Sequence, residues 1–135
     1  MIPYEQTKGS MKILFIDENN IRRRTLELST GHYDPAAVQV IHATMLNALE
    51  RFKMYQGEIF LVLAHMTNSQ KEISETISSI KELSHVHCAI IGLENNLADM
   101  ARLVGADSHC LFPNIVFPKW LDSTLKNCAP ETRLA

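Results

Sequence analysis

The sequence predicts an α/β fold in which helices cover both faces of a parallel sheet, and three observations support this prediction. Five short apolar runs, rich in β-branched residues, are typical of strands that are buried on both faces. These runs alternate with five segments of helical periodicity, and the connections are as short as those of βα units. A chain of 135 residues with 46% hydrophobic residues is long enough to form one domain with a real core.

The expected strands differ in how they end. The first runs from Lys12 to Ile16 and stops abruptly at the acidic pair Asp17 and Glu18. The third, over residues 58–64, is the most hydrophobic run and should lie at the centre of the sheet. The other strands are expected at residues 38–41, 87–92 and 108–112.

Capping residues and glycines mark the expected helices. Asn19 or Asn20 can cap the first helix, which Gly31 ends. The inward side chains of this helix are expected to be Ile21, Thr25, Leu26 and Leu28. The other helices are expected to begin near Thr44, Asn68 or Ser69, Asn95 and Pro118, and to end near Gln56, Leu83, Gly105 and Cys128. The helix after Thr44 should turn inward Leu46, Leu49 and Phe52.

The composition of the chain argues against two classes of function, nucleic-acid binding and membrane insertion, and its two ends are expected to lie outside the folded domain. A net charge of -2 and a pI near 6.3 argue against a nucleic-acid-binding surface, and we interpret Arg22-Arg23-Arg24 as the solvated face of a helix. No apolar stretch is long enough for a membrane span or a signal peptide, so we expect a soluble cytoplasmic protein. The expected parts are a flexible extension over residues 1–11, a domain over residues 12–128, and a tail or linker over residues 129–135.

The cysteines and neighbouring histidines do not form a recognisable metal motif. Cys88, Cys110 and Cys128 have spacings that fit neither a disulfide framework nor a zinc site, so we expect reduced thiols. His85 and His87 would face one side of an extended chain and Cys88 the other, which disfavours a shared metal site.

Asp17 and Glu18 are the first candidates for a functional site. In open α/β sheets ligands bind outside the carboxyl ends of the strands, so this pair would lie at the rim of a crevice. Two acids there favour a divalent cation and disfavour phosphate. No glycine-rich phosphate loop and no nucleophile elbow accompanies the pair. We therefore expect no enzymatic activity and no cofactor.

Four features occur in an informative order along the chain. They are the first strand ending in Asp17-Glu18-Asn19, the apolar third strand, Val104-Gly105-Ala106-Asp107 before the fifth strand, and Phe112-Pro113 after it. From Lys12 to about Asn127 the chain thus resembles the CheY-like receiver domain of two-component response regulators. The resemblance implies a flavodoxin-like three-layer sandwich with strand order 2-1-3-4-5. It also implies four working parts: an acidic pair that binds magnesium, an aspartate at the end of strand three that accepts a phosphoryl group, a Thr or Ser ending strand four, and a lysine before a proline.

Only the acidic pair survives a comparison residue by residue. The phosphoacceptor position falls at Leu63 or Ala64, the switch hydroxyl at Gly92, and the lysine at Phe112. None of these side chains can accept a phosphoryl group or place positive charge beside one. We expect Phe112 to pack over the former pocket and the bond to Pro113 to be cis, as the resembled Lys-Pro bond usually is.

These departures predict a pseudo-receiver that works without phosphorylation, as a protein-interaction or regulatory domain in bacterial signal transduction or transcriptional control. The alternative is an atypical receiver that senses a metal or small molecule at the crevice near Asp17 and Glu18. His65, beside the vacant acceptor position, is interpreted as a partly exposed loop histidine rather than a phosphoryl or metal site.

The resemblance also places a partner surface on the fourth helix, fifth strand and fifth helix. His109 replaces the family's aromatic switch residue, and Trp120 is either an interface anchor or a rim residue of the core. Some residues of the expected interaction face should point outward: Met100, Leu103, Val104, His109, Trp120 and Leu121. A second copy of the chain, a separate protein or an attached output domain would bind there.

Overall fold

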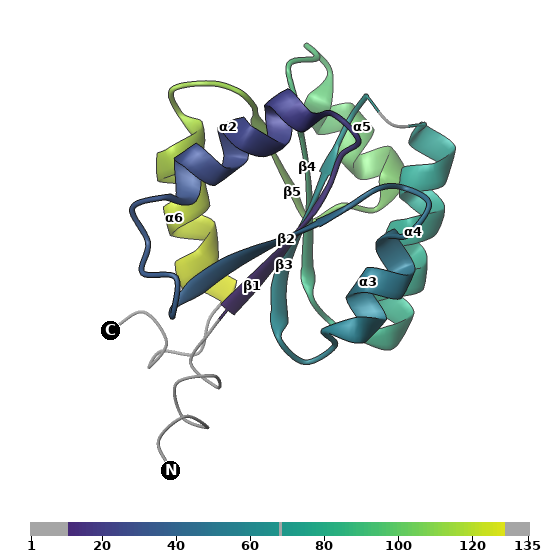
Figure 1. Cartoon of the computed structure of the whole chain (residues 1–135). Helices are drawn as coiled ribbons and strands as arrows, with labels where there is room; N and C mark the ends of the chain where they lie inside the picture. The colour runs from purple at the N-terminus through teal and green to yellow at the C-terminus, as the bar shows by residue number, and fades with distance from the viewer. Residues whose placement is uncertain (1–10, 68, 129–135) are drawn as a thin grey trace.

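The computed structural model describes residues 11–67 and 69–128, in which five strands alternate with five helices (Figure 1). The strands are β1 Met11–Ile16, β2 Val38–Ala43, β3 Ile59–His65, β4 His87–Gly92 and β5 Ser108–Leu111. The helices are α2 Asn20–Thr30, α3 Ala48–Met54, α4 Gln70–Leu83, α5 Leu97–Val104 and α6 Phe117–Cys128. The expected tail over residues 129–135, and the expected extension as far as residue 10, lie outside the described residues.

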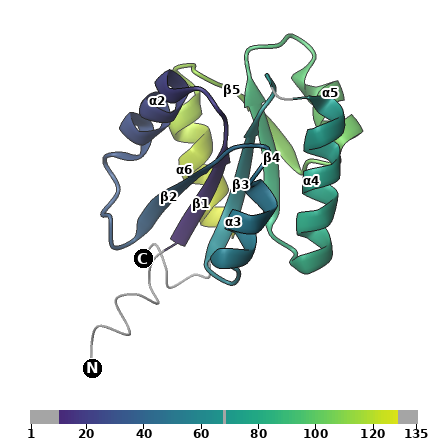
Figure 2. The ribbon, with the colours of Figure 1, turned by 45° about the vertical axis from the view of Figure 1, so that its right-hand side comes forward.

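All neighbouring strands pair in parallel, in the order β2-β1-β3-β4-β5. Helices α2 and α6 cover one face of this sheet, and α3, α4 and α5 cover the other (Figures 1 and 2). The predicted three-layer α/β fold and its strand order are therefore confirmed.

The central strands fill both layers of the core. In β1, Ile13 and Phe15 point into the layer beneath α2 and α6, whereas Leu14 and Ile16 point into the layer beneath the other three helices. Successive side chains of a strand face opposite sides, so a strand that lies between two helical layers must be apolar at every position. This explains why the runs are continuous rather than alternating.

The helix boundaries follow from local capping. The Asn19 side chain accepts a hydrogen bond from the Arg22 N–H, and the Ser69 hydroxyl accepts one from the Glu72 N–H, so both residues are N-caps. Gly105 ends α5 in the left-handed region, with φ of 79°. Few residues other than glycine adopt that conformation without strain.

Three local expectations are wrong. β1 begins at Met11, which is fully buried, rather than at Lys12. In α2 only Leu26 is buried, while Ile21 and Leu28 are 78% and 75% exposed. Helix α3 begins at Ala48 and leaves Leu46 in the preceding turn, 97% exposed. The second and third errors both placed exposed apolar residues on the inward face of an expected helix.

Two further observations concern the state of the cysteines and whether any helix could span a membrane. Cys88 and Cys110 are buried free thiols, and Cys128 is a free thiol of intermediate exposure. Among the described residues, no helix has the length and apolar character needed to cross a bilayer.

Candidate functional site

The carboxyl ends of β1, β3, β4 and β5 bring four candidate positions to one edge of the sheet. Ile16 pairs with Ala64, and therefore Asp17 and His65 follow at the same level on neighbouring strands. Gly92 ends β4 and its carbonyl accepts the N–H of Phe112, the residue after β5. Parallel topology thus gathers residues that are far apart in the sequence.

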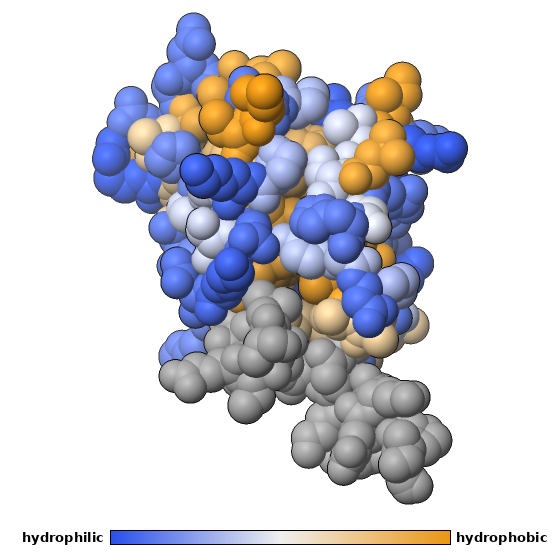
Figure 3. All heavy atoms as spheres, turned by 90° about the vertical axis from the view of Figure 1, so that its left-hand side faces the viewer, coloured by the Kyte–Doolittle hydropathy of each residue, from blue (hydrophilic) through white to orange (hydrophobic). Residues whose placement is uncertain are grey.

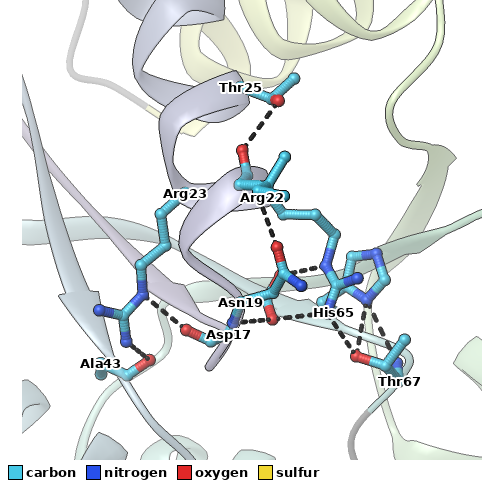
Figure 4. A network of polar contacts seen from close by, with 9 residues as sticks. Asp17, Asn19, Arg22, Arg23, Thr25, Ala43, His65 and Thr67 are labelled. Atoms are coloured by element: carbon cyan, nitrogen blue, oxygen red, sulfur yellow. Dashed lines mark hydrogen bonds and ion pairs between the residues drawn. The ribbon is translucent and has the colours of Figure 1, made fainter.

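Asp17 does not face solvent as a free acid, because Arg22 holds it (Figure 4). The Nε atom of Arg22 donates to Oδ2 of Asp17 at 2.6 Å, and Nη2 donates to Oδ1 at 2.9 Å. The N–H of Asn19 donates to the same Oδ1 at 3.0 Å. Asp17 is 1% exposed, and its hydrogen bonds with Arg22 raise the pKa of that guanidinium above its usual value. The site therefore contains its own cation.

The start of α2 is what aims the arginines at the end of β1. Because Asn19 caps the helix, Arg22 and Arg23 lie in its first turn and reach back over the strand. Arg23 donates through Nε to the Asp17 carbonyl at 2.7 Å and through Nη2 to the Ala43 carbonyl at 3.4 Å. The sequence interpretation of these two arginines as a solvated face is wrong, although Arg24 is exposed as expected.

The acidic pair is divided by this arrangement. Glu18 is exposed, and its Oε2 accepts the Met45 N–H at 2.8 Å, which ties it to the loop after β2. Asp17 instead points into the protein. Its two oxygens and one of those of Glu18 are therefore already engaged by donors of the chain itself.

His65 ends β3 and is 4% exposed, so the interpretation as a partly exposed loop histidine is wrong. Its Nδ1 lies 3.0 Å from the Thr67 hydroxyl and accepts the Thr67 N–H at 3.2 Å. The Thr67 hydroxyl also accepts from Nη2 of Arg22 at 3.0 Å. Figure 4 shows this line of contacts from Asp17 through Arg22 and Thr67 to His65.

Phe112 fills the space at the end of β5. It is 1% exposed, and its ring centroid lies 6.1 Å from that of Phe15, 4.6 Å from that of Phe117 and 6.4 Å from that of His65. The peptide bond to Pro113 is cis. An aromatic cluster therefore occupies the position that the resemblance assigns to a lysine.

Glu94 occupies the space beside Gly92. A Cβ atom on Gly92 would lie 2.5 Å from Oε1 of Glu94, so the carboxylate fills the volume that a side chain at position 92 would need. This Oε1 atom is buried and has no hydrogen-bond partner among the described residues. We call the set Asp17, Arg22, His65, Thr67, Glu94 and Phe112 the carboxyl-edge site.

The remaining candidates are found in several places. Leu63 and Ala64 are fully buried strand residues on opposite faces of β3. In the expected interaction face Leu103 and His109 are exposed and Met100 and Trp120 half-buried, whereas Val104 and Leu121 belong to the core and cannot contact a partner.

The histidines and cysteine near the start of β4 lie at the opposite edge of the sheet. Nε2 of His87 lies 2.7 Å from the Ser108 hydroxyl, whereas Cys88 is buried in the layer beneath α3, α4 and α5. The described part of the chain contains no group of three or more His, Cys, Asp or Glu side chains that could hold a metal ion.

Comparison with solved structures identifies the fold. The chain is similar to a response regulator receiver domain from Clostridium thermocellum, with a TM-score of 0.67 and 20% identity over 87% of this chain and 93% of that one. The fold is that of receiver domains. No protein-family model matches the sequence, and no curated protein matches it either.

Two further similarities extend this result. One is to the structure of the P1 domain of CheA3 in complex with CheY6 from R. sphaeroides, with a TM-score of 0.69 and 15% identity over 87% of this chain and 95% of that one. The other is to a putative pilus assembly protein from Burkholderia thailandensis, with a TM-score of 0.68 and 16% identity over 87% of this chain and 97% of that one. The receiver fold therefore occurs in proteins with differently described roles.

Three members of the carboxyl-edge site were missed by sequence reasoning: Arg22, Thr67 and Glu94. One signal was available for Arg22, because a cap at Asn19 puts an arginine in the first helical turn beside a strand-end aspartate. Thr67 and Glu94 lie in the loops after β3 and β4, where sequence spacing alone does not fix the direction of a side chain.

Proposed function

We propose that this receiver-fold chain is a pseudo-receiver, which acts without phosphorylation as a protein-interaction or regulatory domain in bacterial signal transduction or transcriptional control. The observation that carries the proposal is the bidentate pair between Asp17 and Arg22. Magnesium needs several oxygen ligands in near-octahedral geometry. Because the Arg22 guanidinium already binds both carboxylate oxygens of the buried Asp17, this internal cation takes the place that magnesium would need.

The proposed loss of phosphoryl transfer also has support from what surrounds the pair. Transfer to a protein needs an oxygen nucleophile at the strand-three position, and Leu63 and Ala64 supply none. It also needs positive charge beside the developing oxygens, where the apolar ring of Phe112 is packed. Gly92 has no hydroxyl, and the Glu94 carboxylate beside it would repel a phosphoryl group.

The alternative, a sensor of a metal or small molecule near Asp17 and Glu18, has less support. Asp17 is buried under Arg22, and Glu18 is tied to the Met45 N–H. A metal would have to displace both sets of donors before it could bind the two carboxylates together.

A role in protein interaction fits the apolar side chains left on the surface. Figure 3 shows apolar surface gathered at the upper end of the face that carries α2 and α6, where the strands have their carboxyl ends. Exposed aliphatic residues in this region of the fold are Ile21, Leu93, Ile115 and Val116. On the expected interaction face of α5, β5 and α6, Leu103 is 67% exposed. Apolar patches of this kind are typical of docking surfaces.

A divalent-cation titration tests the closed site. Amide spectra of the wild type should not change on addition of Mg²⁺, because Arg22 neutralises Asp17. The Arg22→Ala variant should show new, saturable shifts at Asp17 and Glu18. Arg24→Ala is the matched control, since Arg24 lies on the same helix and is exposed. Saturable Mg²⁺ shifts at Asp17 in the wild type would favour the sensor alternative.

A sedimentation experiment tests the interaction face. We expect a homodimer, or binding to a partner protein, that Leu103→Glu weakens. Leu28→Glu places the same charge on a leucine of α2 that is 75% exposed, and it should leave that association unchanged. A wild type that remains monomeric and binds no partner through α5, β5 and α6 would reject this face.

A further inference from the structure

The hydrogen bonds of His65 determine which of its nitrogens carries a proton. A backbone N–H can only donate, and the N–H of Thr67 is directed at Nδ1 of His65 at 3.2 Å. Nδ1 therefore has to be unprotonated, and the proton of the neutral ring lies on Nε2. The Thr67 hydroxyl, which accepts from Arg22, lies 3.0 Å from Nδ1 and can donate its own hydrogen to this unprotonated nitrogen.

Charged groups from three segments act on this buried ring. Asp17 follows β1, Arg22 belongs to α2, and Glu94 follows β4; on the β5 side the ring forms a hydrogen bond with the Phe112 backbone. Burial is the main cause that lowers the pKa of His65, and the charge of Arg22 lowers it further. The two carboxylates and the Phe112 backbone act in the opposite direction. The neutral ring is thus favoured at neutral pH, but acidic groups are within range to stabilise a positive ring.

Glu94 is the unusual member of this set. Its Oε1 is buried without a hydrogen-bond donor among the described residues, in a position that only Gly92 leaves open. A buried carboxylate oxygen without a donor is costly, so nearly all such atoms in proteins have a partner. Its charge nevertheless reaches His65, where it favours protonation. The site therefore contains a carboxylate oxygen that has no donor among the described residues, and a histidine that gains a second N–H donor when it is protonated.

We propose that His65, Thr67 and Glu94 form a proton-operated latch, in which neutral His65 holds Thr67 and protonated His65 releases Thr67 and donates to Glu94. Protonation at Nδ1 would set the new N–H against the Thr67 N–H, because both are donors. The hydrogen bond from the Thr67 N–H to Nδ1 must then break, and the Glu94 oxygen is an acceptor with the charge to receive the new donor.

The latch would connect proton concentration to the start of α4. Thr67 lies two residues before Ser69, the N-cap of that helix, so its release is expected to change the surroundings of that cap. Asp17 and Arg22 keep their own bidentate pair, and the change is confined to the hydroxyl contact that Arg22 makes with Thr67. This inference goes beyond the proposed interaction role, because it concerns the state of the isolated chain.

The test is a pH titration of the full chain by NMR, from about pH 8 to about pH 5. In the wild type the Thr67 and Ser69 amide signals should follow the His65 ring signals, with one midpoint below that of a free imidazole, about 6.5. Glu94→Gln should move this midpoint to lower pH, since a stabilising charge is lost. His65→Asn, which keeps an acceptor for the Thr67 N–H but cannot titrate, should leave both amides unchanged.

A matched control lies at the other edge of the sheet. His87 also has a pKa lowered mainly by burial, and it pairs with the Ser108 hydroxyl. His87→Asn should therefore leave the Thr67 titration as it is in the wild type. The latch is contradicted if His65 protonates while the Thr67 amide does not move, or if Glu94→Gln leaves the midpoint in place. Should His65→Asn fail to fold, the Glu94→Gln midpoint decides alone.

Discussion

The two edges of the sheet contain the same kinds of polar contact, but these contacts lie in different surroundings. At the carboxyl edge Asp17 accepts a backbone N–H and a cationic side chain, Arg22. At the amino edge Asp107 likewise accepts the Cys88 N–H at 2.9 Å and the Lys81 ammonium at 2.6 Å. Each edge also pairs a histidine with a hydroxyl group.

The surroundings decide what each edge can do. Asp17 is buried and its partner Arg22 is mostly covered, whereas the Lys81 and Asp107 side chains are 33% and 39% exposed. The amino edge also opens into a groove of about 840 Å³, while Phe112 and Glu94 fill the carboxyl edge. The resemblance to receiver domains implies a reactive carboxyl edge, and in this chain that edge is closed. This contrast supports the proposed interaction role.

The largest expected difference is between the two ion pairs. Arg22→Met should lower the free energy of unfolding by about 3 to 5 kcal/mol, because it leaves the buried Asp17 carboxylate without its cationic partner. Lys81→Met should cost at most about 1 kcal/mol, since solvent screens the Asp107 pair. Urea denaturation of the two variants measures both values. Equal losses would mean that the edges do not differ as described.

A smaller difference is expected between two glycines. Gly105→Ala should cost about 1 kcal/mol or more, because an alanine must adopt a φ of 79°. Gly92→Ala should cost less, since the only severe clash is with the end of the flexible Glu94 side chain, which can move into solvent. Thermal unfolding gives the order of stability, and the Gly92→Ala spectrum should show the loop after β4 displaced. A greater loss for Gly92→Ala would mean that Glu94 cannot move.

The smallest expected difference is in the dependence of stability on pH. Both His65 and His87 have a lowered pKa, chiefly through burial, so the unfolded chain binds protons that the folded chain excludes. Stability should therefore fall as the pH drops below about 6.5, and the fall should end once the folded histidines also protonate. His65→Asn should reduce this dependence more than His87→Asn, because His65 is the more buried of the two. Unfolding midpoints measured across this range decide the order.

The fold could be predicted from the sequence more completely than the site. The fold followed from patterns that every strand repeats, since runs such as 13–16 and 59–64 can be apolar throughout only between two helical layers. The cap at Asn19 could also be predicted, because it depends only on one side chain and the first helical turn after it. The site was less predictable, since its members meet only after four strands have been aligned.

The residues whose surroundings were predicted wrongly illustrate why the site is hard to derive from the sequence. Arg22 looked like one of three solvated arginines, and only the direction of α2 over β1 makes it the partner of Asp17. His65 looked like a loop residue because the apolar run ends at Ala64, yet the strand continues for one residue beside Ile91 of β4. Val104 and Leu121 were included in an interaction face of which only some members were expected to point outward, because helical spacing does not say which face meets the sheet; both are buried.

The most direct test of the closed carboxyl edge is a mass measurement after incubation with acetyl phosphate and Mg²⁺. We predict that the wild type gains no phosphoryl mass. Arg22 forms an ion pair with Asp17, and neither Leu63 nor Ala64 has an oxygen nucleophile in its side chain. A stable adduct of one phosphoryl group, mapped to Asp17, Glu18 or the end of β3, would contradict the account.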